Sequence, residues 1–241
     1  MIKTIFVFSY ISISMIILTP LGVVALFLHF IGLKKFMAWV ISRLCQGWGR
    51  LLIRLTGSTV TVTGIENIPK KGGVCFVSNH CGYFDIVLLL AYCDKPIGFI
   101  AKKELLLVPF LNCWIYMLGG LFIDRKNVKK AVRTINRGVE KIKSGRWMII
   151  FPEGHRSKGR GLLPFHPGSL KLATMAEAPI VPVAIEGSYD VFEKNYRAAS
   201  VQLKVTFCQA IDTASLPSGE RKLILSDKIF SVIKEQLMNH E

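Results

Sequence analysis

The chain has 241 residues, a formal net charge of +15 and a hydrophobic fraction of 51%. A chain this basic and this apolar is more typical of a protein on a membrane with anionic lipids than of a freely soluble one. Nucleic acid is the competing explanation of the charge, and we do not expect it as a partner. The six cysteines form no C-x-x-C pair, which argues against a zinc site and a disulfide framework.

The first segment, residues 4–33, contains no Lys, Arg, Asp or Glu. About 20 apolar residues in a helix suffice to span the hydrocarbon layer, so we expect a membrane-embedded helix here. Pro20 is expected to kink this helix or divide it in two. The segment either crosses the bilayer or re-enters it on the same side, and the sequence does not distinguish these two paths. A cleaved signal peptide is the alternative, but the apolar run is longer than a signal-peptide core.

Residues 36–55 have the pattern of an amphipathic helix. Its cations are expected to lie among anionic headgroups and its tryptophans to act as interfacial anchors. These side chains are Arg43, Arg50, Arg54, Trp39 and Trp48. A surface helix of a soluble domain is the alternative. Because no acidic residue precedes Glu66, the positive charges here favour a cytoplasmic location for the rest of the chain.

After Gly57, short β-branched runs alternate with helical patterns, which predicts an α/β fold with a largely parallel sheet flanked by helices. The expected strands are residues 59–62, 74–78, 98–101, 121–123, 147–151, 180–185 and 202–207. An apolar stripe over residues 128–142 predicts a helix, whose charged side is either solvated or a contact with a membrane or a protein. Residues 220–237 are expected to form a closing helix.

Residues 77–85, Val-Ser-Asn-His-Cys-Gly-Tyr-Phe-Asp, follow an apolar strand. His80 therefore lies just beyond the carboxyl end of a strand, where α/β folds place ligands. On one continuous helix His80 and Asp85 would lie about 140° apart, so they meet only if Gly82 forms a turn and Asp85 begins the next helix. The carboxylate then accepts one imidazole N–H and leaves the other nitrogen free as a base. A helix-capping Asp near an unrelated His is the alternative.

Two further predicted strands end in an arginine. Residues 119–125 close with Arg125, and residues 151–157 contain Arg156. A guanidinium at the carboxyl end of a strand is suited to bidentate binding of a phosphate. Residues 180–185 add an apolar strand that contains Pro182.

Other chemistries fit these residues less well. A zinc ion held by His80, Asp85, His155 and His166 would occupy the lone pair that a base requires, so we expect no metal site. A covalent relay through Cys81 is disfavoured because neighbouring residues of an extended chain point in opposite directions. The sequence contains neither a P-loop nor a G-x-S-x-G elbow, which argues against nucleotide and serine-hydrolase chemistry.

Together these blocks resemble the glycerolipid acyltransferases, above all the 1-acylglycerol-3-phosphate O-acyltransferase family, over about residues 58–210. His80 and Asp85 match the H-x4-D block, residues 119–125 the second, 151–157 the third and Val181-Pro182 the fourth. Residues 102–105 also resemble a family feature. The resemblance implies that His80 is the general base and Asp85 its orienting partner. The implied substrate-binding residues are Arg125, Glu153, Gly154, Arg156 and Lys103.

The resemblance implies an enzyme that moves an acyl chain from acyl-CoA or acyl carrier protein to the sn-2 hydroxyl of lysophosphatidic acid, without a cofactor. Residues 1–56 would be the membrane anchor and residues 57–241 the catalytic domain, facing the cytoplasm on the inner or another membrane. His155 replaces the commonest Thr of the third block, and residues 165–168 lack a Lys that relatives often have, so the headgroup stays open. Transfer to another lysolipid and a non-catalytic lipid-binding module are the alternatives.

Overall fold

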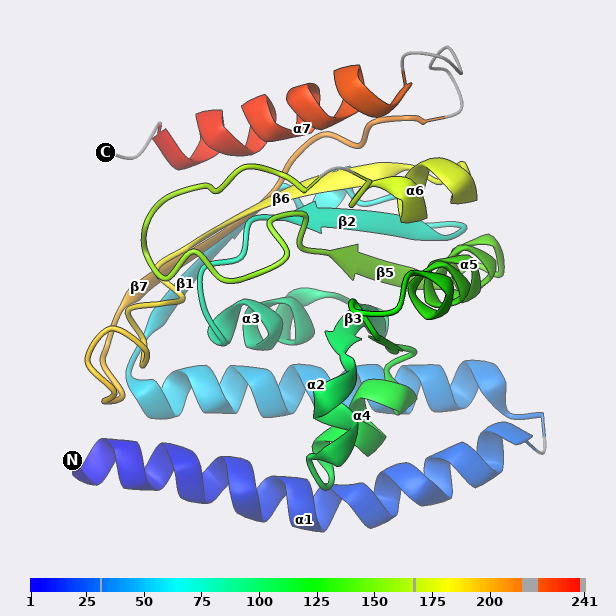
Figure 1. The fold of residues 1–241 in the computed structure, drawn as a ribbon. Helices are drawn as coiled ribbons and strands as arrows, with labels where there is room; N and C mark the ends of the chain where they lie inside the picture. The colour runs from blue at the N-terminus through cyan, green and yellow to red at the C-terminus, as the bar shows by residue number, and fades with distance from the viewer. Residues whose placement is uncertain (31, 167, 214–220, 239–241) are drawn as a thin grey trace.

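The computed structural model describes residues 1–30, 32–166, 168–213 and 221–238. Within them, seven strands form one sheet (Figure 1). The strands are β1 (Thr59–Thr63), β2 (Val74–Ser78), β3 (Ile97–Lys102), β4 (Leu121–Ile123), β5 (Trp147–Ile150), β6 (Ile180–Glu186) and β7 (Gln202–Phe207). The α-helices are α1 (Ile2–Phe30), α2 (Lys34–Thr56), α3 (Phe84–Tyr92), α4 (Leu111–Met117), α5 (Val128–Lys143), α6 (Lys171–Ala176) and α7 (Arg221–Met238), and the 3-10 helices are η1 (Ile65–Asn67) and η2 (Lys103–Leu107).

The sheet has the strand order β1-β7-β6-β2-β5-β3-β4. The strands from β6 to β4 run parallel, whereas β7 is antiparallel to β6 and β1 is parallel to β7. All seven expected strands are present, and the largely parallel sheet is confirmed. Parallel pairing places the carboxyl ends of β6, β2, β5, β3 and β4 along one edge, which is where such folds bind ligands.

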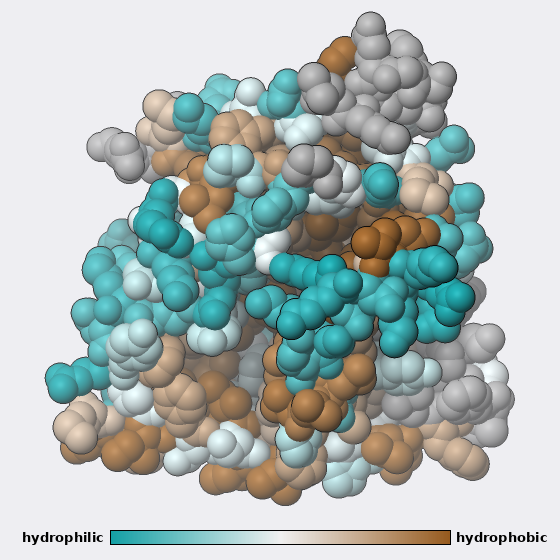
Figure 2. Space-filling view, in the orientation of Figure 1, coloured by the Kyte–Doolittle hydropathy of each residue, from teal (hydrophilic) through white to brown (hydrophobic). Residues whose placement is uncertain are grey.

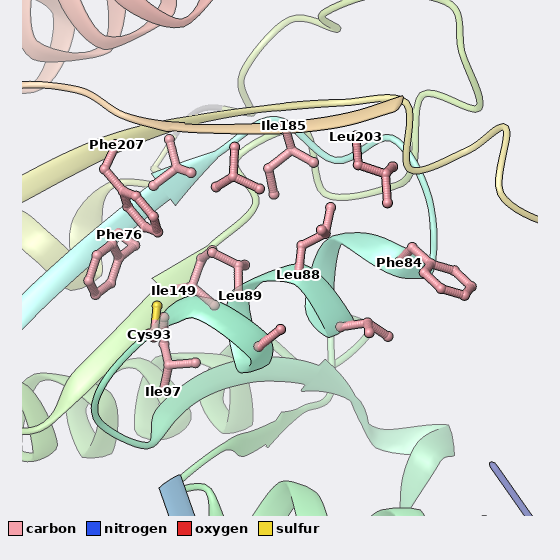
Figure 3. Packing of buried hydrophobic residues seen from close by; sticks show 14 of the residues in the cluster. Phe76, Phe84, Leu88, Leu89, Cys93, Ile97, Ile149, Ile185, Leu203 and Phe207 are labelled. Carbon is pink, nitrogen blue, oxygen red and sulfur yellow. The ribbon is translucent and has the colours of Figure 1, made fainter. Parts of the chain in front are cut away.

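Helices cover both faces of this sheet, because most strand residues are apolar and buried on both sides. One face packs against α3 and α2, and Figure 3 shows Leu88 and Leu89 of α3 directed at Phe76, Ile149 and Ile185 of the sheet. The other face packs against α5, α6 and α7. The outer layer is α1, which lies against α2 on the side away from the sheet (Figure 1).

The first helix is a single bent helix, so Pro20 kinks it without dividing it (Figure 1). Its segment Ile2–Val24 is long and apolar enough to cross a membrane, by length and composition. The outward side of α1 exposes apolar side chains such as Ile5, Ile13 and Val23. Apolar residues gather along the corresponding edge in Figure 2.

The second helix is packed between α1 and the sheet domain. Leu52 and Ile53 are buried in the main core, and Gly49 lies so close to α3 that a Cβ there would be 3.0 Å from Ala91 Cβ. The helix ends at Gly57, whose φ of 73° supplies a left-handed cap. The segment expected to be an anchor therefore contributes directly to the core of the domain.

The expected helix over residues 128–142 is confirmed as α5, but its apolar stripe is only partly buried. Val139 and Ile142 lie in the core, whereas Val128 is 76% exposed. The first turn of α5, residues 128–130, is exposed. The expected closing helix is confirmed as α7, with residue 220 outside the described residues.

Candidate active site

His80 and Asp85 meet in the turn between β2 and α3. His80 Nδ1 lies 2.6 Å from Asp85 Oδ2, and the same oxygen accepts the N–H groups of Cys81 and Gly82 at 2.8 and 3.0 Å. Asp85 is 0% exposed, so these donors replace the water that a carboxylate needs. Gly82 is required for space, because a Cβ there would lie 2.9 Å from the Cα of Tyr189. The turn at Gly82, which was expected to bring His80 and Asp85 together, is therefore present.

The imidazole of His80 is held on one side and accessible on the other. Its ring stacks on Phe151, with 4.1 Å between centroids, and its side chain is 19% exposed. With Nδ1 bonded to Asp85, Nε2 is the nitrogen left to act, and no described residue makes a hydrogen bond to it. A histidine oriented in this way is equipped to accept a proton from an external hydroxyl.

Glu153 supports the main chain of this turn. Its Oε1 accepts the His80 N–H at 2.6 Å, and its Oε2 accepts the Leu163 N–H at 3.1 Å. Burial raises the pKa of Glu153 to about 6, against the opposing effect of these two hydrogen bonds. The sequence resemblance implied acceptor binding, but Glu153 is 0% exposed with both oxygens occupied. Its contacts support the main chain of His80, and acceptor binding by Glu153 stays a prediction.

Arg156 reaches the same turn from the loop after β5. Its guanidinium lies over the ring of Tyr83, 3.8 Å from the centroid, and forms an ion pair with Glu193. Glu193 also accepts the Tyr83 N–H at 2.6 Å. Arg156 is therefore held between an aromatic face and a carboxylate beside the histidine turn, which fixes its planar group in one orientation.

The remaining cations predicted to bind substrate lie along the same edge. Arg125 is exposed and donates from Nη1 to the Gly154 carbonyl at 2.6 Å. Lys103 forms an ion pair with Asp124 at 2.9 Å, and this hydrogen bond raises the Lys103 pKa.

Gly154 has a φ of 70°, and a Cβ there would lie 2.6 Å from the His166 ring. His155, like His166, is exposed, and Pro167 lies outside the described residues.

The thiol of Cys81 is unsuited to nucleophilic attack. Burial and the neighbouring Asp85 charge raise its pKa to about 12. Its Sγ accepts a hydrogen bond from Asn79 Nδ2 and donates to the Ile185 carbonyl. A thiol held in the neutral form lacks the thiolate that a covalent relay requires.

An apolar pocket lies beneath the site, between α1, α2, α3 and α4. Its volume is about 290 Å³, and its walls are almost entirely apolar. Tyr83, from the histidine turn, contributes to the lining together with Leu90 of α3 and Trp114 of α4. A pocket of this size and character suits a hydrocarbon chain.

Three polar residues of the site were not identified from the sequence. Asn79 bonds both the N–H and the carbonyl of Ile185 at 2.8 Å, which joins the ends of β2 and β6. Ser188 donates a hydrogen bond to Asp85, and Glu193 pairs with Arg156. Ser188 follows the carboxyl end of an apolar strand, as His80 does, and that position was the available signal.

The chain is similar to several acyltransferases of known name. The 1-acyl-sn-glycerol-3-phosphate acyltransferase of Borreliella burgdorferi is 28% identical over 203 residues, which are 84% of this chain and 78% of that protein. The protein of that name in Saccharomyces cerevisiae is 34% identical and that in Escherichia coli 40%, over 73% and 57% of this chain. This chain matches only 58% and 56% of the length of those two proteins.

The fold has a counterpart among solved structures. The 1-acyl-sn-glycerophosphate (LPA) acyltransferase of Thermotoga maritima superposes with a TM-score of 0.83 and 27% sequence identity, over 99% of this chain and 96% of that chain. The family model described as Acyltransferase matches residues 59–186, more than half of the sequence and the part that holds His80, Asp85, Arg125 and Arg156. This chain therefore belongs to the Acyltransferase family.

Proposed function

We propose that this protein is a 1-acylglycerol-3-phosphate O-acyltransferase, which transfers a fatty acyl group from a thioester to the sn-2 hydroxyl of lysophosphatidic acid. The observation that carries the proposal is the His80–Asp85 pair, in which a buried carboxylate orients an accessible imidazole. The names of the Borreliella, yeast and Escherichia coli relatives support the acceptor.

The chemistry assigned to the pair is general base catalysis. His80 Nε2 accepts the proton of the acceptor hydroxyl while the hydroxyl oxygen attacks the carbonyl carbon of the thioester. Asp85 stabilises the resulting imidazolium through Nδ1. Collapse of the tetrahedral intermediate breaks the carbon–sulfur bond and forms the ester, and the imidazolium returns its proton to the departing thiolate. These steps need no metal ion or prosthetic group.

We assign the acyl chain to the apolar pocket. Tyr83 links the pocket to the histidine turn, so a chain lying there would bring its carbonyl carbon towards His80. The pocket is lined by α1 and α2 as well as by the sheet domain, which gives the N-terminal helices a role in holding substrate. The pocket would hold the acyl chain of either donor, and the CoA or carrier-protein part of the donor would lie outside it.

We place the acceptor phosphate near Arg125 and Arg156. Each guanidinium has five N–H groups, and the contacts with Gly154 and Glu193 engage one nitrogen, Nη1, in each case. The remaining N–H groups of either residue can bind a phosphate oxygen. Lys103, already paired with Asp124, and the exposed His155 are further candidate donors at this edge.

We also propose that the enzyme rests on a membrane through its N-terminal helices. The outward side of α1 is apolar, whereas Arg43, Arg50 and Arg54 are exposed on α2. Trp39 is exposed as an interfacial anchor would be, but Trp48 donates its indole N–H to Ser14 of α1. The catalytic domain is then expected on the cytoplasmic side.

The test is an acyl-transfer assay with the purified full-length protein and mixed lipid–detergent micelles. Lysophosphatidic acid and lysolipids with larger headgroups are each offered with acyl-CoA and with acyl carrier protein. We expect phosphatidic acid as the main product, and a loss of at least about a hundredfold in His80→Ala. Lys234→Ala, on the exposed side of α7, is the control. Preference for another lysolipid would overturn the acceptor, and an active His80→Ala would overturn the mechanism.

A further inference from the structure

The turn after β6 brings a third polar side chain to the histidine turn. β6 pairs with β2 in parallel, so both strands end at the same edge of the sheet. The chain leaves β6 at Gly187, whose φ is 79° and whose Cα lies so close to β7 that a Cβ would be 2.8 Å from the Gln202 carbonyl. A hydrogen bond of 3.1 Å from the Asp190 N–H to the Gly187 carbonyl closes the turn. The next residue, Ser188, is thereby directed at the start of α3.

The Ser188 hydroxyl donates a hydrogen bond to Asp85 Oδ1. Ser188 is 1% exposed, so water does not compete for this contact. The other carboxylate oxygen, Oδ2, carries His80 together with the N–H groups of Cys81 and Gly82. Among the described residues, Ser188 is the only hydrogen-bond donor to Oδ1.

We propose that Ser188 is a positioning residue for acyl transfer, which holds the Asp85 carboxylate in the rotation that presents Oδ2 to His80 Nδ1. This inference rests on the proposed function, because it concerns the same reaction. Ser188 lies two residues beyond the segment that matches the family model, and outside the four sequence blocks. It acts through Asp85 and does not contact the reacting atoms.

The physical reason is the cost of an unpaired acceptor in a buried site. Without the hydroxyl, Oδ1 is a charged oxygen with neither water nor a protein donor. Rotation of the carboxylate towards other N–H groups, or entry of a water molecule beside Oδ1, would then lower the free energy. Either change lengthens the hydrogen bond between Asp85 and His80. The step that suffers is proton transfer, since substrates bind through other residues.

The experiment compares Ser188→Ala, Ser188→Thr and Ser188→Val in the full-length enzyme. Threonine and valine have nearly the same shape and differ in the hydroxyl, so their difference isolates the hydrogen bond from packing. We expect kcat to fall about tenfold in Ser188→Ala and Ser188→Val, with KM for both substrates within about twofold. Ser188→Thr should keep kcat within about threefold of the wild type. Thermal unfolding of each variant shows that the fold is intact.

The outcomes separate this inference from the proposed function. An unchanged kcat in Ser188→Ala, or equal losses in Ser188→Thr and Ser188→Val, overturns the role of the hydroxyl while wild-type activity stands. A loss that appears only in KM also overturns it, because a positioning residue acts on the chemical step. A wild-type enzyme that does not acylate lysophosphatidic acid overturns the proposed function itself.

Discussion

Replacing Glu153 by Gln tests whether this carboxyl supports the main chain of His80. Burial raises its pKa from 4.5 to about 6 in the folded protein. Because the folded-state pKa lies above the unfolded value, Glu153 contributes most to stability below pH 4.5 and loses this contribution as the pH rises through about 6. Glutamine does not titrate, so the difference in unfolding free energy between the two proteins must depend on pH.

The size of this dependence follows from the two pKa values. A difference of about 1.5 between them corresponds to about 2 kcal/mol. Glu153→Gln should be less stable than the wild type at about pH 4, because its amide nitrogen must face one of the two N–H donors, and this deficit should shrink by about 2 kcal/mol at about pH 7.5. Chemical unfolding in detergent, followed by tryptophan fluorescence, measures it. Glu140→Gln on α5 controls for loss of an exposed carboxyl.

A deficit that stays constant or grows between these pH values would refute the reasoning, because Glu153 would then not be a carboxyl destabilised by burial. Kinetics supply a second check. Support of the His80 main chain predicts a lower kcat in Glu153→Gln with KM for lysophosphatidic acid unchanged. A higher KM for lysophosphatidic acid with normal kcat would instead support the acceptor-binding role that the sequence resemblance implied.

Changes at Asp85, Arg156, Leu90 and the N-terminal helices test other parts of the protein. Asp85→Asn should lower kcat at least about a hundredfold in steady-state assays, because an amide cannot stabilise the imidazolium. Arg156→Ala should raise KM for lysophosphatidic acid about tenfold or more, and Arg156→Lys should recover only part of this loss, since an ammonium lacks the planar fork. Leu90→Phe should shift the products of a mixed acyl-CoA pool towards shorter chains, because it fills the pocket. Deletion of residues 1–56 should give aggregation in sedimentation assays, because it exposes the apolar surface of α3 that α2 covers.

Each of these expectations has a clear contrary result. Normal turnover in Asp85→Asn would mean that the carboxylate is only structural. Equal changes in the KM of donor and acceptor in Arg156→Ala would remove Arg156 from the phosphate site. An unchanged product distribution in Leu90→Phe would place the acyl chain elsewhere. A monodisperse protein after deletion of residues 1–56 would show that α1 and α2 are not needed to cover the core.

The sequence determined the local structure and the candidate pair of the site. Apolar runs of strand length predicted β2, β5 and β6, because strands buried on both faces are apolar throughout, and β-branched residues marked β1. The five-residue spacing of His80 and Asp85, with Gly82 between them, required a turn before α3, and the structure has it. A strand followed by polar residues is a local signal, so it can be found without knowing which strands are neighbours.

Only the tertiary structure decided which strand ends meet. The order β6-β2-β5 places the loops after β6 and β5 on either side of the histidine turn, so Ser188 reaches Asp85 across 103 positions and Glu153 reaches His80 across 73. Strand order results from packing of the whole sheet and leaves no mark in the local pattern of any one strand. For the same reason the sequence did not show that Glu153 accepts the His80 N–H, a contact that depends on the pairing of β2 with β5.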